Sequence, residues 1–285
     1  MSGNDAANGP SLAERFALTR RNWNERTPVH AASDFYDVAG FKAGRITLTN
    51  IETSEVGAVA GKSILHLQCH FGMDTMSWAR LGATATGVDI SDAAIDLARE
   101  LNDELGLGVR FIRANVYDLP DLIDERFDVV YTGVGAICWL PDLDAWAAIV
   151  ARFLKPGGTF YMLDVHPMSL VFDAVQDPDG ATDLRPVYPY FPDPAGILDD
   201  GERPTYAGTT PIKTPVYEWQ HSLSEVVNAL LRAGLTIEFL NEFPVAPYQA
   251  FPQMRRRDGW WRLTERDGSI AFLFSIRALA TGQIG

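Results

Sequence analysis

The sequence contains little cysteine and little histidine. Among its 285 residues there are two cysteines and five histidines. Cys69 and Cys138 lie in apolar strand or turn contexts, which predicts free thiols in a reducing cytoplasm and not a disulfide. The histidines are scattered, and the pair Cys69–His70 has no partners at the spacing that metal ligands need. These shortages argue against a disulfide-built scaffold, predict no metal site and favour a cytoplasmic location.

Positive charge is also scarce. Lys and Arg total 24 against 37 Asp and Glu, so the net charge is −13. This balance argues against nucleic acid as a partner, because phosphate contacts need clustered Lys and Arg. The one basic run, at 255–257, predicts a solvated loop tip, with an anion site as the alternative. No apolar run approaches the roughly 18 residues of a membrane span, and the N-terminus lacks the apolar core of a secretion signal. We therefore expect a small-molecule substrate, no membrane partner, and a monomer or homodimer.

Short apolar runs alternate with segments of helical periodicity between residues 63 and 165. After Ser91, for example, Ala94, Leu97, Ala98 and Leu101 fall on one face of a helix. Such alternation predicts a mainly parallel sheet with helices on both faces. The expected strands are 63–68, 84–89, 109–116, 127–134 and 159–165, and the expected helices are 73–82, 92–105 and 142–154.

The turn after the first expected strand and the end of the second form the most informative stretch. Residues 68–72 make a tight turn into a helix, and Asp89 follows about 20 residues later, at the end of the next strand. A helix N-terminus offers unpaired N–H groups to a polar ligand. An acid at the end of the second strand can accept hydrogen bonds from both hydroxyls of a ribose. This spacing predicts an adenosine-containing cofactor.

The chain on either side of this alternation has a different character. Residues 1 to about 20 predict a disordered or loosely helical start, and 1–60 are interpreted as a cap over the cofactor site. Residues 61–285 form the cofactor-binding domain in this interpretation. Within it, 166–216 is rich in Pro, Asp, Gly and Tyr, which favours a substrate-binding insertion or lid. A helix at 222–233 and strands at 236–243 and 269–278 follow, the strands as an antiparallel hairpin at one sheet edge, with a long loop at 244–268 between them.

Five motifs in this order resemble those of the class I S-adenosylmethionine-dependent methyltransferases. They are HLQCHFG at 66–72, GVDIS at 87–91, ANVYDLP at 114–120, FDVV at 127–130 and LKPGGTF at 154–160. Of the glycines usual in the first motif, only Gly72 is present, and Gln68 and His70 occupy positions where the family has glycine. The resemblance implies an α/β, Rossmann-like fold with a mostly parallel seven-stranded sheet, an antiparallel C-terminal hairpin strand and helices on both faces. It also implies S-adenosyl-L-methionine as cofactor.

The resemblance assigns cofactor contacts residue by residue. Asp89 would bind the ribose hydroxyls, with a helix cap or a solvated loop acid as the alternative. Asn115 would hold the adenine amino group, with an ordinary turn asparagine as the alternative. His70 would contact the cofactor carboxylate or the acceptor, or point to solvent. Trp23, Phe35 and Tyr36 would close over the sulfonium or merely anchor the N-terminal segment. The full expected set is Tyr36, Gln68, Cys69, His70, Gly72, Asp89, Ile90, Asn115, Val116 and Thr132.

The implied reaction transfers a methyl group to an O, N or C atom of a small molecule, and an O or N acceptor can need a base. His166, at the end of the fifth expected strand, is the first candidate, and His221 with Glu218 the second; a structural or capping role is the alternative for each histidine. Two other functions stay open, an NAD(P)-dependent oxidoreductase and a non-catalytic adenosyl-cofactor-binding module. Aromatic residues near the predicted open side favour an enclosed acceptor pocket: Trp139, Trp219, Trp260 and Trp261.

Overall fold

A single seven-stranded sheet organises the protein. The computed structural model describes residues 9–176, 182–191 and 193–281. Its sheet has the order β12-β15-β5-β4-β1-β2-β3, in which β1 to β5 run parallel and β15 pairs antiparallel with both β5 and β12. The predicted fold class is thereby confirmed. The strands are β1 (Ser63–Leu67), β2 (Thr84–Asp89), β3 (Arg110–Arg113), β4 (Phe127–Thr132), β5 (Leu154–Val165), β12 (Leu235–Phe243) and β15 (Leu273–Ala280).

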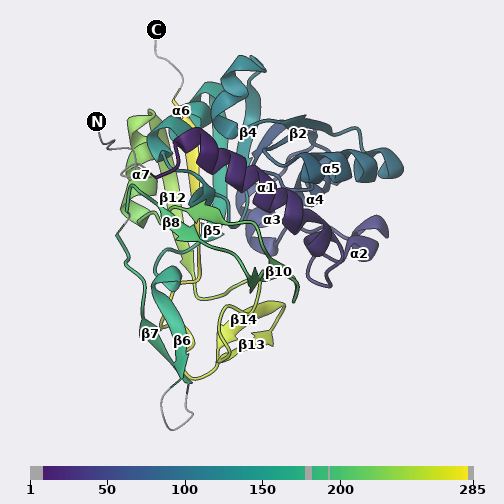
Figure 1. Cartoon of the computed structure of the whole chain (residues 1–285). Coiled ribbons are helices and arrows are strands. Elements are labelled where there is room, and N and C mark those ends of the chain that lie inside the picture. Colours follow the sequence, from purple (N-terminus) through teal and green to yellow (C-terminus); the bar gives the residue numbers. More distant parts are fainter. Residues whose placement is uncertain (1–8, 177–181, 192, 282–285) are drawn as a thin grey trace, which may run out of the picture.

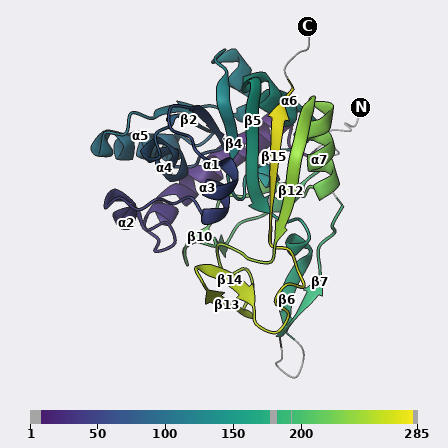
Figure 2. The same ribbon diagram turned by 180° about the vertical axis from the view of Figure 1, so that it is seen from behind.

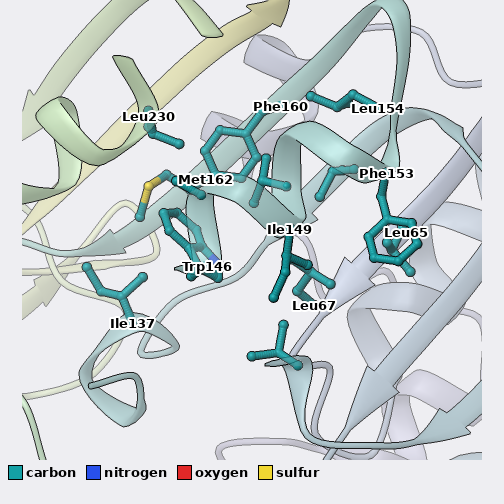
Figure 3. Close-up of a cluster of buried hydrophobic side chains, with 14 of the residues drawn as sticks. Leu65, Leu67, Ile137, Trp146, Ile149, Phe153, Leu154, Phe160, Met162 and Leu230 are labelled. Carbon is teal, nitrogen blue, oxygen red and sulfur yellow. The ribbon is translucent and has the colours of Figure 1, made fainter. Parts of the chain in front are cut away.

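Successive side chains of each strand point to opposite faces of this sheet, so apolar side chains lie on both faces, and helices cover both. In β1, Leu65 and Leu67 pack into the cluster formed with α6 and α7, whereas Ile64 packs with Trp78 of α4 on the opposite face. Figure 3 shows the first cluster, in which Trp146 lies among side chains from the sheet and α7. The covering helices are α3 (Asn50–Val56), α4 (Met73–Arg80) and α5 (Asp92–Leu105) on one face and α6 (Leu143–Phe153) and α7 (Leu223–Arg232) on the other.

Two predicted boundaries shift for local chemical reasons. The third strand ends at Arg113 and not at 116, because Asn115 caps a 3-10 helix, η1 (Val116–Asp121), with its side-chain oxygen accepting from the Tyr117 N–H. The helix expected at 142–154 ends at Phe153, and Leu154 already belongs to β5. A proline disfavours the helical conformation of the residue before it. The Lys155-Pro156 sequence that follows Leu154 therefore keeps the chain extended.

The N-terminal segment is a regular helix, α1 (Leu12–Ala31). Of the two alternatives expected for the start of the chain, the disordered one is therefore wrong from residue 12 onward; residues 1–8 lie outside the described residues. Ser11 and Glu14 form a capping box that starts it. Asn24 anchors it to α5, where its Oδ1 accepts from Ser91 Oγ at 2.7 Å. In Figure 1 this purple helix crosses the front of the molecule over the central strands, with α5 beside it, and a short helix, α2 (Val38–Lys42), follows it.

The insertion at 166–216 is built from short strands. β6 (Phe172–Gln176) pairs with β7 (Thr182–Pro186), β8 (Ile197–Asp199) with β11 (Val216–Glu218), and β9 (Arg203–Pro204) with β10 (Pro211–Ile212). β11 connects the insertion to α7, and α1 packs against β10 and β11. This packing links the N-terminal helix to the insertion.

The long loop expected at 244–268 contains a β-hairpin, which corrects the prediction. Its strands are β13 (Met254–Arg257) and β14 (Trp260–Leu263), so the arginines at 255–257 are exposed strand residues and not a loop tip. Asp258 and Gly259 both have positive φ, as the Asp-Gly type I′ turn requires. Figures 1 and 2 place this hairpin beside β6–β7 at one end of the sheet. Among the described helices, none has the length and apolar character needed to cross a membrane.

Candidate functional site

A cavity of about 430 Å³ opens at the carboxyl ends of the parallel strands, a size within the usual range of small-ligand sites. Its wall combines the β1–α4 turn, the ends of β2 and β4, one face of α1, and residues of the insertion and of the 244–268 segment. Of the residues predicted to bind the cofactor, Thr132 lies outside the lining, and its buried hydroxyl has no partner among the described residues. The others line the cavity: Tyr36, Gln68, Cys69, His70, Gly72, Asp89, Ile90, Asn115 and Val116.

The β1–α4 turn keeps a glycine-type backbone although two of its glycines are replaced. Gln68 has φ 60° and His70 φ 51°, both in the left-handed region that costs a non-glycine residue about 1–2 kcal/mol. Side-chain contacts compensate: Gln68 Nε2 donates to the Ala136 carbonyl at 2.8 Å, and His70 Nε2 lies 3.1 Å from Nδ1 of His30. The solvent-facing alternative for His70 is wrong, because its side chain is buried against the cavity.

Two polar atoms of this turn have no hydrogen-bond partner among the described residues. They are Oε1 of Gln68 and Nδ1 of His70, and both are buried. Buried polar atoms without a partner are uncommon, because each carries the full penalty of its lost hydration. Their position on a cavity wall fits a site whose polar ligand completes the hydrogen bonding.

Asp89 holds the turn and faces the cavity at the same time. Its two carboxylate oxygens accept from the backbone N–H groups of His70 and Ser91, each at 2.8 Å. Burial raises the pKa of Asp89 to about 6, although these hydrogen bonds act in the opposite direction. The N-cap of α5 is Ser91, whose Oγ accepts from the Ala94 N–H at 3.1 Å. Each carboxylate oxygen keeps a lone pair for a ligand, so the placement is compatible with the predicted ribose contact.

Aromatic rings converge from distant parts of the chain around the turn. The Trp23 ring lies 4.9 Å from the ring of His70 and 5.3 Å from that of Trp139. Tyr36 shares a 2.7 Å hydrogen bond between its hydroxyl and that of Tyr206 in the insertion. Trp139 and Trp219 line the cavity, but Trp260 and Trp261 do not, because both lie on β14. The aromatic pocket expected from four tryptophans is therefore formed by only two of them.

The structure separates the two candidate catalytic histidines. His166 lies outside the cavity lining; its Nδ1 accepts from the Met168 N–H at 3.0 Å and its Nε2 lies 2.7 Å from a Glu242 oxygen. His221 lines the cavity, together with Glu218, and its Nε2 lies 2.7 Å from the Leu140 carbonyl. Because a carbonyl only accepts, Nε2 of His221 carries the proton and Nδ1 has a free lone pair.

Several polar residues of the wall were not predicted. Glu52 accepts a short hydrogen bond from the Tyr131 hydroxyl, and burial raises its pKa to about 7. Asp164 accepts from the N–H groups of Ala136 and Ile137 at 3.2 and 3.1 Å and so holds the loop after β4. Neither acid belongs to a motif quoted from the sequence, and only the folded structure shows that both lie on the cavity wall. Further unpredicted wall residues are Arg26, His66, Asp74, Tyr206 and Tyr248.

Known proteins share both the fold and part of the sequence. Residues 65–162 match a family model described as a methyltransferase domain. The chain is 34% identical over 119 residues to the ubiquinone biosynthesis O-methyltransferase of Alkalilimnicola ehrlichii, which covers 41% of this chain and 48% of that protein. A solved S-adenosylmethionine-dependent methyltransferase from Mesorhizobium loti has the same fold, with a TM-score of 0.58 at 22% identity over 84% of this chain and 99% of its own.

A relative with greater coverage is the ubiquinone biosynthesis O-methyltransferase of Pseudomonas syringae pv. tomato. It is 31% identical over 177 residues, which are 61% of this chain and 70% of that protein. Two other relatives of the same name are matched over only about half of their length. The identity to a protein matched over 70% of its length, together with the domain match across the parallel strands, shows that the chain belongs to the class I S-adenosylmethionine-dependent methyltransferase family.

Proposed function

We propose that this protein transfers a methyl group from S-adenosyl-L-methionine to a small molecule. The observation that carries the proposal is the convergence of Asp89, the β1–α4 turn and Asn115 on one cavity, as binding of an adenosyl group requires. An oxygen acceptor is favoured over nitrogen or carbon, since the relatives are named as O-methyltransferases. The unpaired cysteines fit the cytoplasmic location expected from the sequence.

The residues of the cavity would hold the cofactor as follows. Asp89 would accept from the ribose hydroxyls, Ile90 and Val116 would border the adenine, and the turn with its unpartnered Gln68 and His70 atoms would meet the methionine part. The bound cofactor supplies a methyl group on a positively charged sulfur. Trp23 and Tyr36, whose ring centroids lie 4.9 and 5.5 Å from that of His70, would shield that charge from water. The alignment of the acceptor would be the main contribution of the protein.

His221 is our candidate for the base that takes the acceptor proton. Burial lowers its pKa, so the ring is neutral near pH 7, and its Nδ1 lone pair is free because Nε2 donates to the Leu140 carbonyl. Glu218 lies on the same wall. His166, the first candidate from the sequence, becomes the second, because it would have to leave its contact with Glu242 to reach an acceptor.

Calorimetric titration of the purified protein with S-adenosylhomocysteine, S-adenosylmethionine and NAD⁺ tests this proposal. We expect the two adenosyl ligands to bind in the micromolar range and NAD⁺ not to bind, because the side chains of Gln68 and His70 occupy the turn that a pyrophosphate must approach. Tighter binding of NAD⁺ would favour an oxidoreductase. Failure of both adenosyl ligands to bind at millimolar concentration would refute the proposal.

A further inference from the structure

Arg26 is a buried cation without an anionic partner. The residue is 9% exposed, and across residues 9–176, 182–191 and 193–281 it is the one buried Lys or Arg. Within these described residues it forms no ion pair, and its one hydrogen bond runs from Nε to Asn22 Oδ1 at 2.6 Å. Removing a charge from water without a partner is costly. The two terminal nitrogens of the guanidinium are therefore free donors at the cavity wall.

The second arginine on the cavity wall differs in this respect. Arg45 donates to the carbonyl of Tyr36 at 2.8 Å and pairs with Asp37 at 3.1 Å, so its charge is already compensated near the surface. Arg26, in contrast, lies in the aromatic part of the cavity. Its guanidinium carbon is 5.3 Å from the ring centroids of both Trp23 and Trp139.

The two tryptophan rings fix the guanidinium and leave its edge free. They stand at 85° to each other, so they contact it from two directions without hydrogen-bonding its terminal nitrogens. Cation–π contacts of this kind stabilise the charge in place and orient it. A planar guanidinium held in this way presents two parallel N–H groups, which match the two oxygens of a carboxylate.

Arg26 lies in the part of the cavity where the insertion and the loop after β4 approach the β1–α4 turn: its guanidinium contacts Trp139, and Trp23 beside it lies 4.9 Å from the ring of His70. Glu218 lines this part, and it forms no ion pair with Arg26 in the described structure. Burial raises the pKa of Glu218, and the nearby Arg26 charge lowers it in part. Burial, His30 and Arg26 all lower the pKa of His70 in the β1–α4 turn, whereas Arg26 is not among the causes that shift the pKa of Asp89 at the predicted ribose end. The remaining wall here is aromatic, with the stacked rings of Tyr206 and Tyr248 at 5.2 Å.

We propose that the methyl acceptor carries a carboxylate, which Arg26 binds, on an aromatic or apolar body that packs against Trp139, Tyr206 and Tyr248. This inference rests on the proposed function and narrows its substrate class. Charge-assisted, bidentate hydrogen bonds to the carboxylate would supply the partner that the buried guanidinium lacks. A neutral amide of the same shape offers only one acceptor and no charge, so it should bind about ten- to a hundredfold more weakly.

Calorimetry on protein saturated with S-adenosylhomocysteine tests this inference with matched probe pairs. The probes are benzoate against benzamide and indole-3-acetate against indole-3-acetamide. Wild-type protein should prefer the carboxylate in at least one pair by about tenfold or more. Arg26→Met should remove this preference, and Arg26→Lys should restore part of it. Arg21→Met, an exposed position on the same helix, is the matched control and should behave as wild type.

Three results separate the outcomes. Equal binding of carboxylates and amides by wild-type protein overturns the inference. A loss of S-adenosylhomocysteine affinity in Arg26→Met that equals or exceeds the loss of carboxylate affinity also overturns it, because Arg26 would then hold the carboxylate of the cofactor. If wild-type protein fails to bind S-adenosylhomocysteine at all, the proposed function itself fails, and this inference with it. Melting temperatures of all variants, measured without ligand, verify that each one is folded.

Discussion

Replacement of Asp89 by Asn is the most direct test of how the cavity binds the adenosyl group. The side chain keeps its size and one acceptor oxygen, but it loses the charge that strengthens hydrogen bonds from the ribose hydroxyls. Hydrogen bonds to a charged group contribute about 1.5–3 kcal/mol each. We therefore expect the Kd for S-adenosylhomocysteine at pH 7.5 to rise about ten- to a hundredfold, which corresponds to about 1.4–2.8 kcal/mol.

The raised pKa of Asp89 adds a pH dependence with a definite sign. Burial is the main cause of the value of about 6, so the carboxyl is mostly ionised at pH 7.5 and mostly protonated at pH 5. If the ribose hydroxyls prefer the ionised form, the cofactor competes with a proton, and its affinity falls as the pH drops through 6. For this pKa the expected loss between pH 7.5 and pH 5 is about tenfold.

Isothermal titration calorimetry with S-adenosylhomocysteine at both pH values measures these effects. Wild-type protein should show the pH-dependent loss, and Asp89→Asn should bind weakly at both values. Glu52→Gln is the control, because Glu52 lines the same cavity and also has a raised pKa, yet its removal should leave the loss at pH 5 in place. An Asp89→Asn protein that binds with unchanged affinity would refute the assigned ribose contact.

Three further predictions concern stability, each measured by urea unfolding. Gly72→Ala should lose about 2–4 kcal/mol, because the residue has φ 75° and a Cβ would lie 2.4 Å from the ring of Phe111; a loss below 1 kcal/mol would contradict this packing. Phe160→Ala should lose about 3–5 kcal/mol, since the ring is fully buried in the core beside α6, and a small loss would mean that the core refills the cavity. Because burial raises the pKa of Glu52 to about 7, its ionisation disfavours the folded state as the pH rises from about 4.5 to 7. The stability of Glu52→Gln relative to wild type should therefore increase by about 1–3 kcal/mol when the pH is raised from 5 to 8. The same stability difference at both pH values would contradict the raised pKa.

The alternation of strands and helices could be predicted because each element buries its own periodic apolar face. Helix α1 lacked that signal. Its buried residues are polar or charged. Asn22 and His30 hydrogen-bond to partners elsewhere in the chain, and Arg26 stacks on Trp139. A polar face buried by such long-range contacts has no apolar periodicity to detect. The β13–β14 hairpin, by contrast, did carry a local signal, the Asp258–Gly259 turn, within a segment otherwise interpreted as a loop.

The sequence by itself determined where the strands end, because each strand is a local apolar run. It therefore also determined where Asp89 and the β1–α4 turn lie, since parallel strands bring their carboxyl ends to one edge of the sheet. Only the tertiary structure decided what closes over them. Tyr36 and Tyr206 share a hydrogen bond across 170 residues of chain, and His30 meets His70 from a helix that no motif indicated. Such contacts depend on how whole elements pack, and no local pattern of residues encodes that packing.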